Sequence, residues 1–188
     1  GQPALAITDL NNLFGGVKFY KEGRGKGVKP ILGAEVQLEG LAGDLAQISR
    51  VILLVQSKQG YLNLCELLAR GWTKNVVKAQ SVIKLEWLQE LSQGLILLSG
   101  AQAGPVGQAL VQGDADKAAD LALQLASVFP HRFYLELQRA GRPEDDAPSR
   151  PPRRVRVRDG RRARRRGSGT TARSARRHPG SARAAPAA

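Results

Sequence analysis

The stretch from Leu5 to Glu39, LAITDLNNLFGGVKFYKEGRGKGVKPILGAEVQLE, decides the fold. An apolar strand over Ala4 to Ile7 ends at Thr8-Asp9, a helix follows, and a glycine-broken loop leads into a second apolar strand that ends at Glu35. This order predicts a β-α-β unit, in which the C-terminal ends of the strands point into one crevice. We therefore expect Asp9 and Glu35 to lie close together. Two carboxylates gathered at such an edge indicate a metal or phosphate site.

The charge of the chain is concentrated at one end. The 188 residues carry a formal net charge of +13, yet from Pro151 onward there are 13 arginines, no lysine and one acid. Residues 1–150 hold 16 basic and 15 acidic residues and are nearly neutral. The high isoelectric point thus belongs to the tail, and the body has the composition of an ordinary globular domain that can bury one core.

Several classes of protein are disfavoured by composition. The single cysteine, Cys65, rules out an intrachain disulfide framework and fits a reducing compartment. No apolar run approaches the roughly 20 residues of a membrane span, and the N-terminus has no signal-peptide pattern. We expect a cytoplasmic protein with no membrane association.

The rest of the body alternates between apolar strands and amphipathic helices. Asn11 or Asn12 is expected to cap the first helix, and the glycine-rich run Lys21 to Lys29 to form a turn. Further strands are expected over Pro30–Leu38, Arg50–Gln56, Gly94–Gly100 and Phe133–Gln138, and helices over Gly60–Arg70, Leu85–Leu91 and Asp116–Val128, with another beginning at Pro105. The continuous apolar strands favour a parallel α/β sheet, either open or barrel-like.

The tail from residue 147 to 188 loses this pattern and is built mainly from Arg, Ala, Gly, Ser and Pro. Such a segment cannot bury enough apolar surface to offset its ordering entropy, so it is predicted to be disordered. Arg, Ala, Gly and Pro have GC-rich codons, which favours out-of-frame translation of a GC-rich gene. The alternative is a natural polycationic arm that contacts nucleic acid through Arg161, Arg162, Arg164, Arg165 and Arg166.

Four motifs in the body resemble a known family. They are PALAITDLNNLFGGVKFY (3–20), GVKPILGAE (27–35), GLILLSG (94–100) and YLELQRAGRP (134–143), in matching order and spacing. The body resembles the N-terminal PHP (polymerase and histidinol phosphatase) domain of the proteobacterial DNA polymerase III alpha subunit. This resemblance implies a distorted (βα)7 barrel, of which residues 1–146 would form a partial domain that lacks the first strand and everything after the middle.

The resemblance also implies a site whose ligands can be checked position by position. Active PHP domains hold metal ions with several histidines and carboxylates, and Glu35 matches one of these ligand positions. Leu10 stands where the family has a histidine after Thr-Asp, Arg50 where it has a histidine at a strand start, and Ala101 where it has a cysteine. These three ligand positions would be lost, with Asp9 as the carboxylate nearest to Glu35.

Leucine and alanine offer no metal ligand, and Arg50 would place a positive charge beside any cation. We therefore expect no catalytic residue, metal or cofactor in this chain, and an ion pair with Arg50 in place of a metal. At best, Glu35 and Asp9 would hold one loosely hydrated Mg²⁺.

The resemblance implies a part of a DNA-directed DNA polymerase (a nucleotidyltransferase, which uses Mg²⁺) that is inactive by itself. Its PHP domain would be a scaffold that docks the proofreading exonuclease (epsilon) subunit and braces the polymerase module within the holoenzyme on DNA. Two alternatives remain open: a metal-dependent PHP phosphoesterase or exonuclease, and nucleic-acid binding through the arginine tail.

Overall fold

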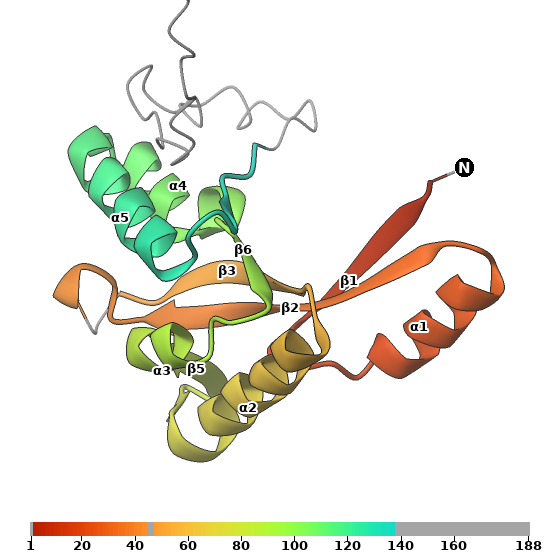
Figure 1. The fold of residues 1–188 in the computed structure, drawn as a ribbon. Coiled ribbons are helices and arrows are strands. Elements are labelled where there is room, and N and C mark those ends of the chain that lie inside the picture. The colour runs from red at the N-terminus through yellow and green to blue at the C-terminus, as the bar shows by residue number, and fades with distance from the viewer. Residues whose placement is uncertain (1, 45–46, 138–188) are drawn as a thin grey trace, which may run out of the picture.

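A seven-stranded mixed sheet runs through the middle of the molecule (Figure 1). The computed structural model describes residues 2–44 and 47–137. The path of hydrogen-bonded neighbours is β4-β5-β2-β3-β6-β7, and β1 also pairs with β2. The strands are β1 (Ala4–Leu10), β2 (Lys29–Glu39), β3 (Ser49–Val55), β4 (Val76–Val77), β5 (Gln80–Lys84), β6 (Leu95–Leu98) and β7 (Phe133–Tyr134). The predicted α/β class is confirmed, and the arrangement is consistent with part of a PHP-type barrel.

The central strand is β2. Along one side its first part pairs in parallel with β1 and its last part in parallel with β5, while its other side pairs with β3. The β1 register places Asp9 opposite Ala34 and Leu10 opposite Glu35. Because β2 continues beyond Glu35 as far as Glu39, this carboxylate lies within the strand and not at its end.

The expectation of a parallel sheet is wrong for β3, which is antiparallel to both β2 and β6. The connection from β2 to β3 is nine residues long (40–48), and its described part contains the 3-10 turn η1 (Leu41–Gly43). A parallel return would need a crossover of a dozen or more residues, usually a helix, whereas a short connection reverses the chain. The apolar run of β3 is thus buried in the middle of a mixed sheet.

In the described part of the chain, five α-helices pack around the sheet: α1 (Gly16–Gly25), α2 (Lys58–Lys74), α3 (Leu85–Glu90), α4 (Pro105–Val111) and α5 (Ala115–Val128). A second 3-10 turn, η2 (Ala101–Ala103), follows β6. The Ser57 hydroxyl caps α2 by accepting from the Gly60 N–H, and the Asp114 carboxylate caps α5 by accepting from the Lys117 N–H. Both are the residue types that satisfy the free N–H groups of a first turn.

The first helix begins differently from the expectation. Its N-cap is Gly15, so neither Asn11 nor Asn12 caps it, and the helix continues through Gly25 into the run that was expected to be a turn. Asn12 instead closes a local turn, accepting from the Phe14 N–H at 3.0 Å. The Gly15 N–H is bound by Asp9 Oδ2 at 3.0 Å. A side chain from β1 therefore satisfies the start of α1.

The core lies on one face of the sheet. Alternate residues of β2, β3 and β6 are fully buried there: Ala34, Val36, Leu38, Val51, Leu53, Leu95 and Leu97. They join one apolar cluster with side chains of α2 and α5, among them Leu64, Leu67, Leu121 and Leu125, together with Phe129. The residues between them, which include Glu35, Gln37 and Ile52, face the other way and are only half-buried. This second face is the one that carries the candidate site.

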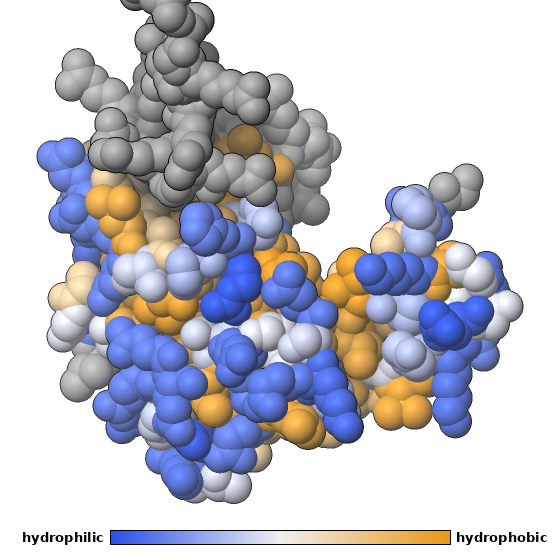
Figure 2. Space-filling view, viewed as in Figure 1, coloured by the Kyte–Doolittle hydropathy of each residue, from blue (hydrophilic) through white to orange (hydrophobic). Residues whose placement is uncertain are grey.

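Apolar groups are also exposed between α1 and the rest of the body (Figure 2). A groove of about 290 Å³ lies there, and its walls include Leu13, Val17, Tyr20 and Tyr61. No helix among residues 2–44 and 47–137 is long and apolar enough to cross a membrane.

Candidate functional site

The site is built around Glu35 on the half-buried face of the sheet. Leu10 of β1 is directly opposite Glu35, and Ile52 of β3 lies opposite it on the other side. The Glu35 carboxylate accepts from Arg50 Nη1 at 3.4 Å. The two side chains are 29% and 48% exposed, so the pair lies at the surface. The expected ion pair between Arg50 and Glu35 is confirmed.

Asp9 does not join this pair, and the expected convergence of the two carboxylates is wrong. Asp9 is in register with Ala34, while Glu35 is in register with Leu10. Because successive side chains of a strand point to opposite faces, Asp9 and Glu35 lie on opposite sides of the sheet although they are near neighbours in it. Asp9 is engaged with the Gly15 N–H at the start of α1.

The structure brings together the other positions that the family pattern singled out. Arg50 stands at the start of β3, and its carbonyl lies against Gly100, where a Cβ would be only 2.2 Å from that oxygen. Ala101 follows Gly100 and is the first residue of η2. Leu10 is the register partner of Glu35, and Glu35 is paired with Arg50, so the positions of Leu10, Glu35, Arg50 and Ala101 are neighbours in the fold. Of the four, only Glu35 carries a metal-binding atom.

The fit to a metal is poor. Among the described residues, no group of three or more His, Cys, Asp or Glu side chains is placed to hold a metal ion. A catalytic zinc site takes about three protein ligands, and a magnesium site takes carboxylates without a competing cation. Here one carboxylate faces a guanidinium. The residues present do not fit the metal centre of an active PHP enzyme, and no chemical step can be derived through one.

Comparison with known proteins agrees with this arrangement of elements. The family model described as the PHP domain matches residues 1–140. The chain belongs to the PHP domain family. Relatives include proteins named DNA polymerase III subunit alpha from Pseudomonas fluorescens, 45% identical over 146 residues, and from Escherichia coli (strain K12), 40% identical over 148 residues. Each alignment covers 78% of this chain, which spans about an eighth of the relatives' length (12% and 13%).

One carboxylate at the site of this PHP domain was not recognised as part of it from the sequence. Glu136 lies just beyond β7, and its Oε2 accepts from the Gly100 N–H at 2.7 Å. Its own N–H donates to the Ser99 hydroxyl at 2.9 Å. Through these two hydrogen bonds, Glu136 holds the loop after β6 in place next to Arg50. The sequence gives no signal for this contact, because 36 residues separate the two partners.

A polar network at the end of β1 also has no sequence signal. The Asn11 N–H donates to the Glu35 carbonyl at 2.7 Å, and the Asn11 carbonyl accepts from Trp72 Nε1 at 2.8 Å. Asn11 is 2% exposed and has a positive φ of 55°, a conformation that asparagine tolerates better than most residues. The C-terminal end of α2 is thereby tied to the strand ends around the site.

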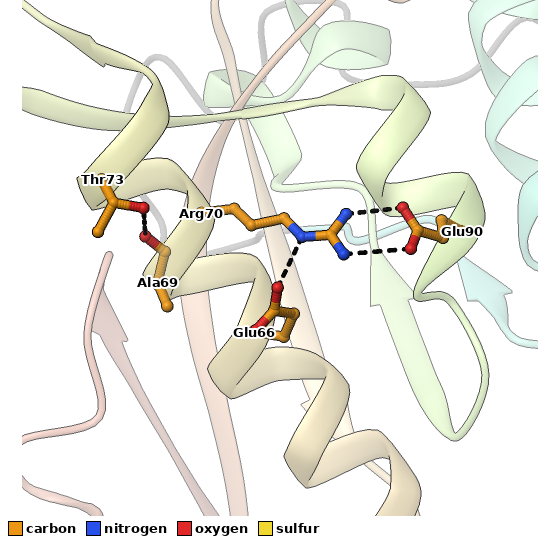
Figure 3. Close-up of polar contacts among 5 residues, drawn as sticks. All are labelled: Glu66, Ala69, Arg70, Thr73 and Glu90. Atoms are coloured by element: carbon orange, nitrogen blue, oxygen red, sulfur yellow. Dashed lines mark hydrogen bonds and ion pairs between the residues drawn. The ribbon is translucent and has the colours of Figure 1, made fainter.

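The shortest ion-pair contacts among the described residues lie away from the site, between α2 and α3 (Figure 3). Arg70 Nε donates to Glu66 at 2.8 Å. Arg70 Nη1 and Nη2 donate to the two carboxylate oxygens of Glu90, at 2.6 and 3.1 Å. Hydrogen bonds from Arg70 hold the pKa of the Glu90 carboxyl below its ordinary value, and Glu90 and Glu66 raise the pKa of Arg70. The bidentate contact orients α3 on α2 and is structural.

The five tail arginines that were predicted to contact nucleic acid, Arg161, Arg162, Arg164, Arg165 and Arg166, lie outside the described residues. The division of the chain at residues 146 and 147 lies there too, and both stay predictions.

Proposed function

We propose that this chain is part of a DNA polymerase III alpha subunit and that its PHP domain acts as a structural scaffold, without hydrolytic chemistry of its own. Two relatives that bear the alpha-subunit name are 45% and 40% identical to the chain. The whole protein would be a DNA-directed DNA polymerase that uses Mg²⁺ and works in the cytoplasm on DNA.

The observation that carries the scaffold assignment is the ion pair between Glu35 and Arg50. A multi-metal phosphoesterase needs neutral imidazoles and carboxylates to fix its cations and activate a water. At this site, leucine and alanine stand at two of the ligand positions, and the permanently charged Arg50 pairs with the carboxylate that remains. The pair supplies the charge balance that a metal would otherwise supply.

Metal titration tests the assignment. The purified chain is titrated with Zn²⁺ and with Mn²⁺ by isothermal calorimetry, with Glu35→Gln as the matched variant. We expect no saturable binding that depends on Glu35. Binding in the micromolar range that disappears in Glu35→Gln would refute the scaffold assignment, and hydrolysis of a generic phosphodiester that disappears in the same variant would favour the phosphoesterase alternative.

The partners that we propose are the proofreading exonuclease (epsilon) subunit and the rest of the polymerase III holoenzyme. Co-migration of the chain with purified exonuclease subunit in size-exclusion chromatography is the expected result. Separate elution at concentrations of tens of micromolar would contradict the docking role. The chain alone should not extend a primed template, so primer extension by it would contradict the proposal.

A further inference from the structure

A strongly basic surface lies on α1 and the turn that follows it. Residues 16–29 hold five of the 16 basic residues of residues 1–150 but only one of their 15 acidic residues, Glu22. All five basic side chains are exposed. They are Lys18, Lys21, Arg24, Lys26 and Lys29. Among the ion pairs of the described residues, none involves these five cations or Glu22. The segment thus carries an uncompensated positive charge on an element that stands out from the rest of the fold (Figure 1).

This charge does not help α1 to form. Lys18 is the third residue of the helix, and a cation in the first turn opposes the helix dipole, whereas only the last turn, which holds Arg24, favours one. Lys21 is three residues from both Lys18 and Arg24, so like charges are neighbours on the helix surface and repel each other. An arrangement that works against the helix indicates an anionic ligand.

Exposed aromatic rings accompany these cations. Phe14, just before α1, is 92% exposed, and Tyr20 is 48% exposed. Tyr20 and Lys21 line the groove of about 290 Å³ between α1 and the body, and Tyr61 of α2 lines it too (Figure 2). Proteins bind single-stranded nucleic acids with rings and cations in this combination, because bases stack on the rings while phosphates contact the cations. The base faces of a duplex are already stacked on one another and cannot use such rings.

We propose that the α1 surface, which consists of Phe14, Lys18, Tyr20 and Lys21 with Tyr61 across the groove, binds single-stranded nucleic acid. Phosphates lie on the two lysines, and a base stacks on an exposed ring. An acidic protein segment would satisfy the lysines, but it would give the rings no base to stack on. The site is separate from the arginine tail and from the pair of Glu35 and Arg50, and it does not depend on the scaffold assignment.

Photo-crosslinking of the full chain locates the site even in the presence of the arginine tail. The probe is a single-stranded oligothymidylate that carries 5-iodouracil, which couples on irradiation to aromatic rings stacked on it. Residues 138–188 contain no Phe, Tyr or Trp, so the tail cannot give this product. We expect adducts on Phe14, Tyr20 or Tyr61, identified by mass spectrometry. Adducts on other rings alone, or no adduct, would overturn the proposal.

Salt-dependent binding measurements test the two lysines. Lys18→Gln/Lys21→Gln should weaken the binding of a fluorescent oligothymidylate by roughly tenfold, and should lower the slope of log K against log salt by about 1.4, or about 0.7 for each lost phosphate contact. Lys74→Gln/Lys78→Gln, at the end of α2 and in the turn after it, is the charge-matched control and should leave both values nearly unchanged. Circular dichroism checks that both variants keep their fold. Equal losses in the two would mean that only net charge matters, which overturns the proposal.

An abasic strand of the same length separates stacking from charge. Phe14→Ala/Tyr20→Ala should weaken the binding of oligothymidylate by about fivefold or more and leave the binding of the abasic strand unchanged. The same loss with both strands, or no loss with either, would refute base stacking on this surface. Displacement of the oligonucleotide from the iodouracil-reactive site by a polyglutamate peptide of equal charge would identify an acidic protein segment as the ligand and would overturn the proposal as well.

Discussion

Alanine in place of Gly60 should destabilise the protein although alanine is the better helix former. Gly60 lies in the first turn of α2, against the loop that leads into β6. A Cβ at this position would come within 1.8 Å of the Gly94 carbonyl oxygen and 2.4 Å of its carbon. Both atoms are backbone, so no side chain can turn away, and α2 or the loop has to move.

The size of the effect follows from that contact. Ordinary contact begins at 3.4 Å, so the two elements must separate by about 1.6 Å, which loosens the packing of Leu64 and Leu67 on the sheet. Overpacking of this kind costs up to about 3 kcal/mol. Against this cost, alanine stabilises a helix by up to about 1 kcal/mol relative to glycine. We expect a net loss of about 2 kcal/mol in the free energy of unfolding.

Gly25→Ala is the matched control. Gly25 is the last residue of α1, is exposed, and has nothing within 4 Å of the position where a Cβ would stand. Only the helix preference acts there, so this variant should be more stable by about 0.5 kcal/mol. Urea unfolding followed by tryptophan fluorescence and circular dichroism measures both variants. If Gly60→Ala matched or exceeded the wild-type stability, the close approach of α2 to Gly94 would be refuted.

Two further predictions concern contacts made by α2. Trp72→Phe removes the indole N–H that donates to the Asn11 carbonyl at 2.8 Å. It should lower the free energy of unfolding by about 1 kcal/mol in urea titrations. An unchanged midpoint of urea unfolding would show that this hydrogen bond contributes nothing to stability. The Glu90 carboxyl has its pKa lowered by Arg70, so the stability that this pair provides is present at neutral pH and is lost as the pH falls through the lowered pKa. Glu90→Gln should therefore be less stable than the wild type at pH 7 and should converge with it in acid, measured by thermal unfolding as a function of pH; a difference that stays constant across the pH range would contradict this.

Local chemistry explains the elements that the sequence predicted correctly. The apolar runs of β2, β3 and β6 are strands, and the helix expected over Asp116–Val128 is present as α5, capped by Asp114. The hairpin of β4 and β5 was missed. Its two turn residues, Lys78 and Ala79, both have positive φ, of 49° and 61°. Such turns are usually marked by Asn-Gly or a similar pair, so the sequence carried no signal.

For the candidate site, the sequence by itself determined which atoms are available. Leu10 and Ala101 bring no metal ligand and Arg50 brings a fixed positive charge wherever the chain places them. The ion pair between Arg50 and Glu35 was expected because the family resemblance places both positions at one site. Only the tertiary structure decided which groups meet. An apolar strand reads the same whether it runs parallel or antiparallel, and the direction of β3 follows from the short connection after β2. The register of β1 on β2 then placed Asp9 and Glu35 on opposite faces of the sheet. Side chains alternate between the two faces along a strand, and the pairing register decides which residues of neighbouring strands share a face.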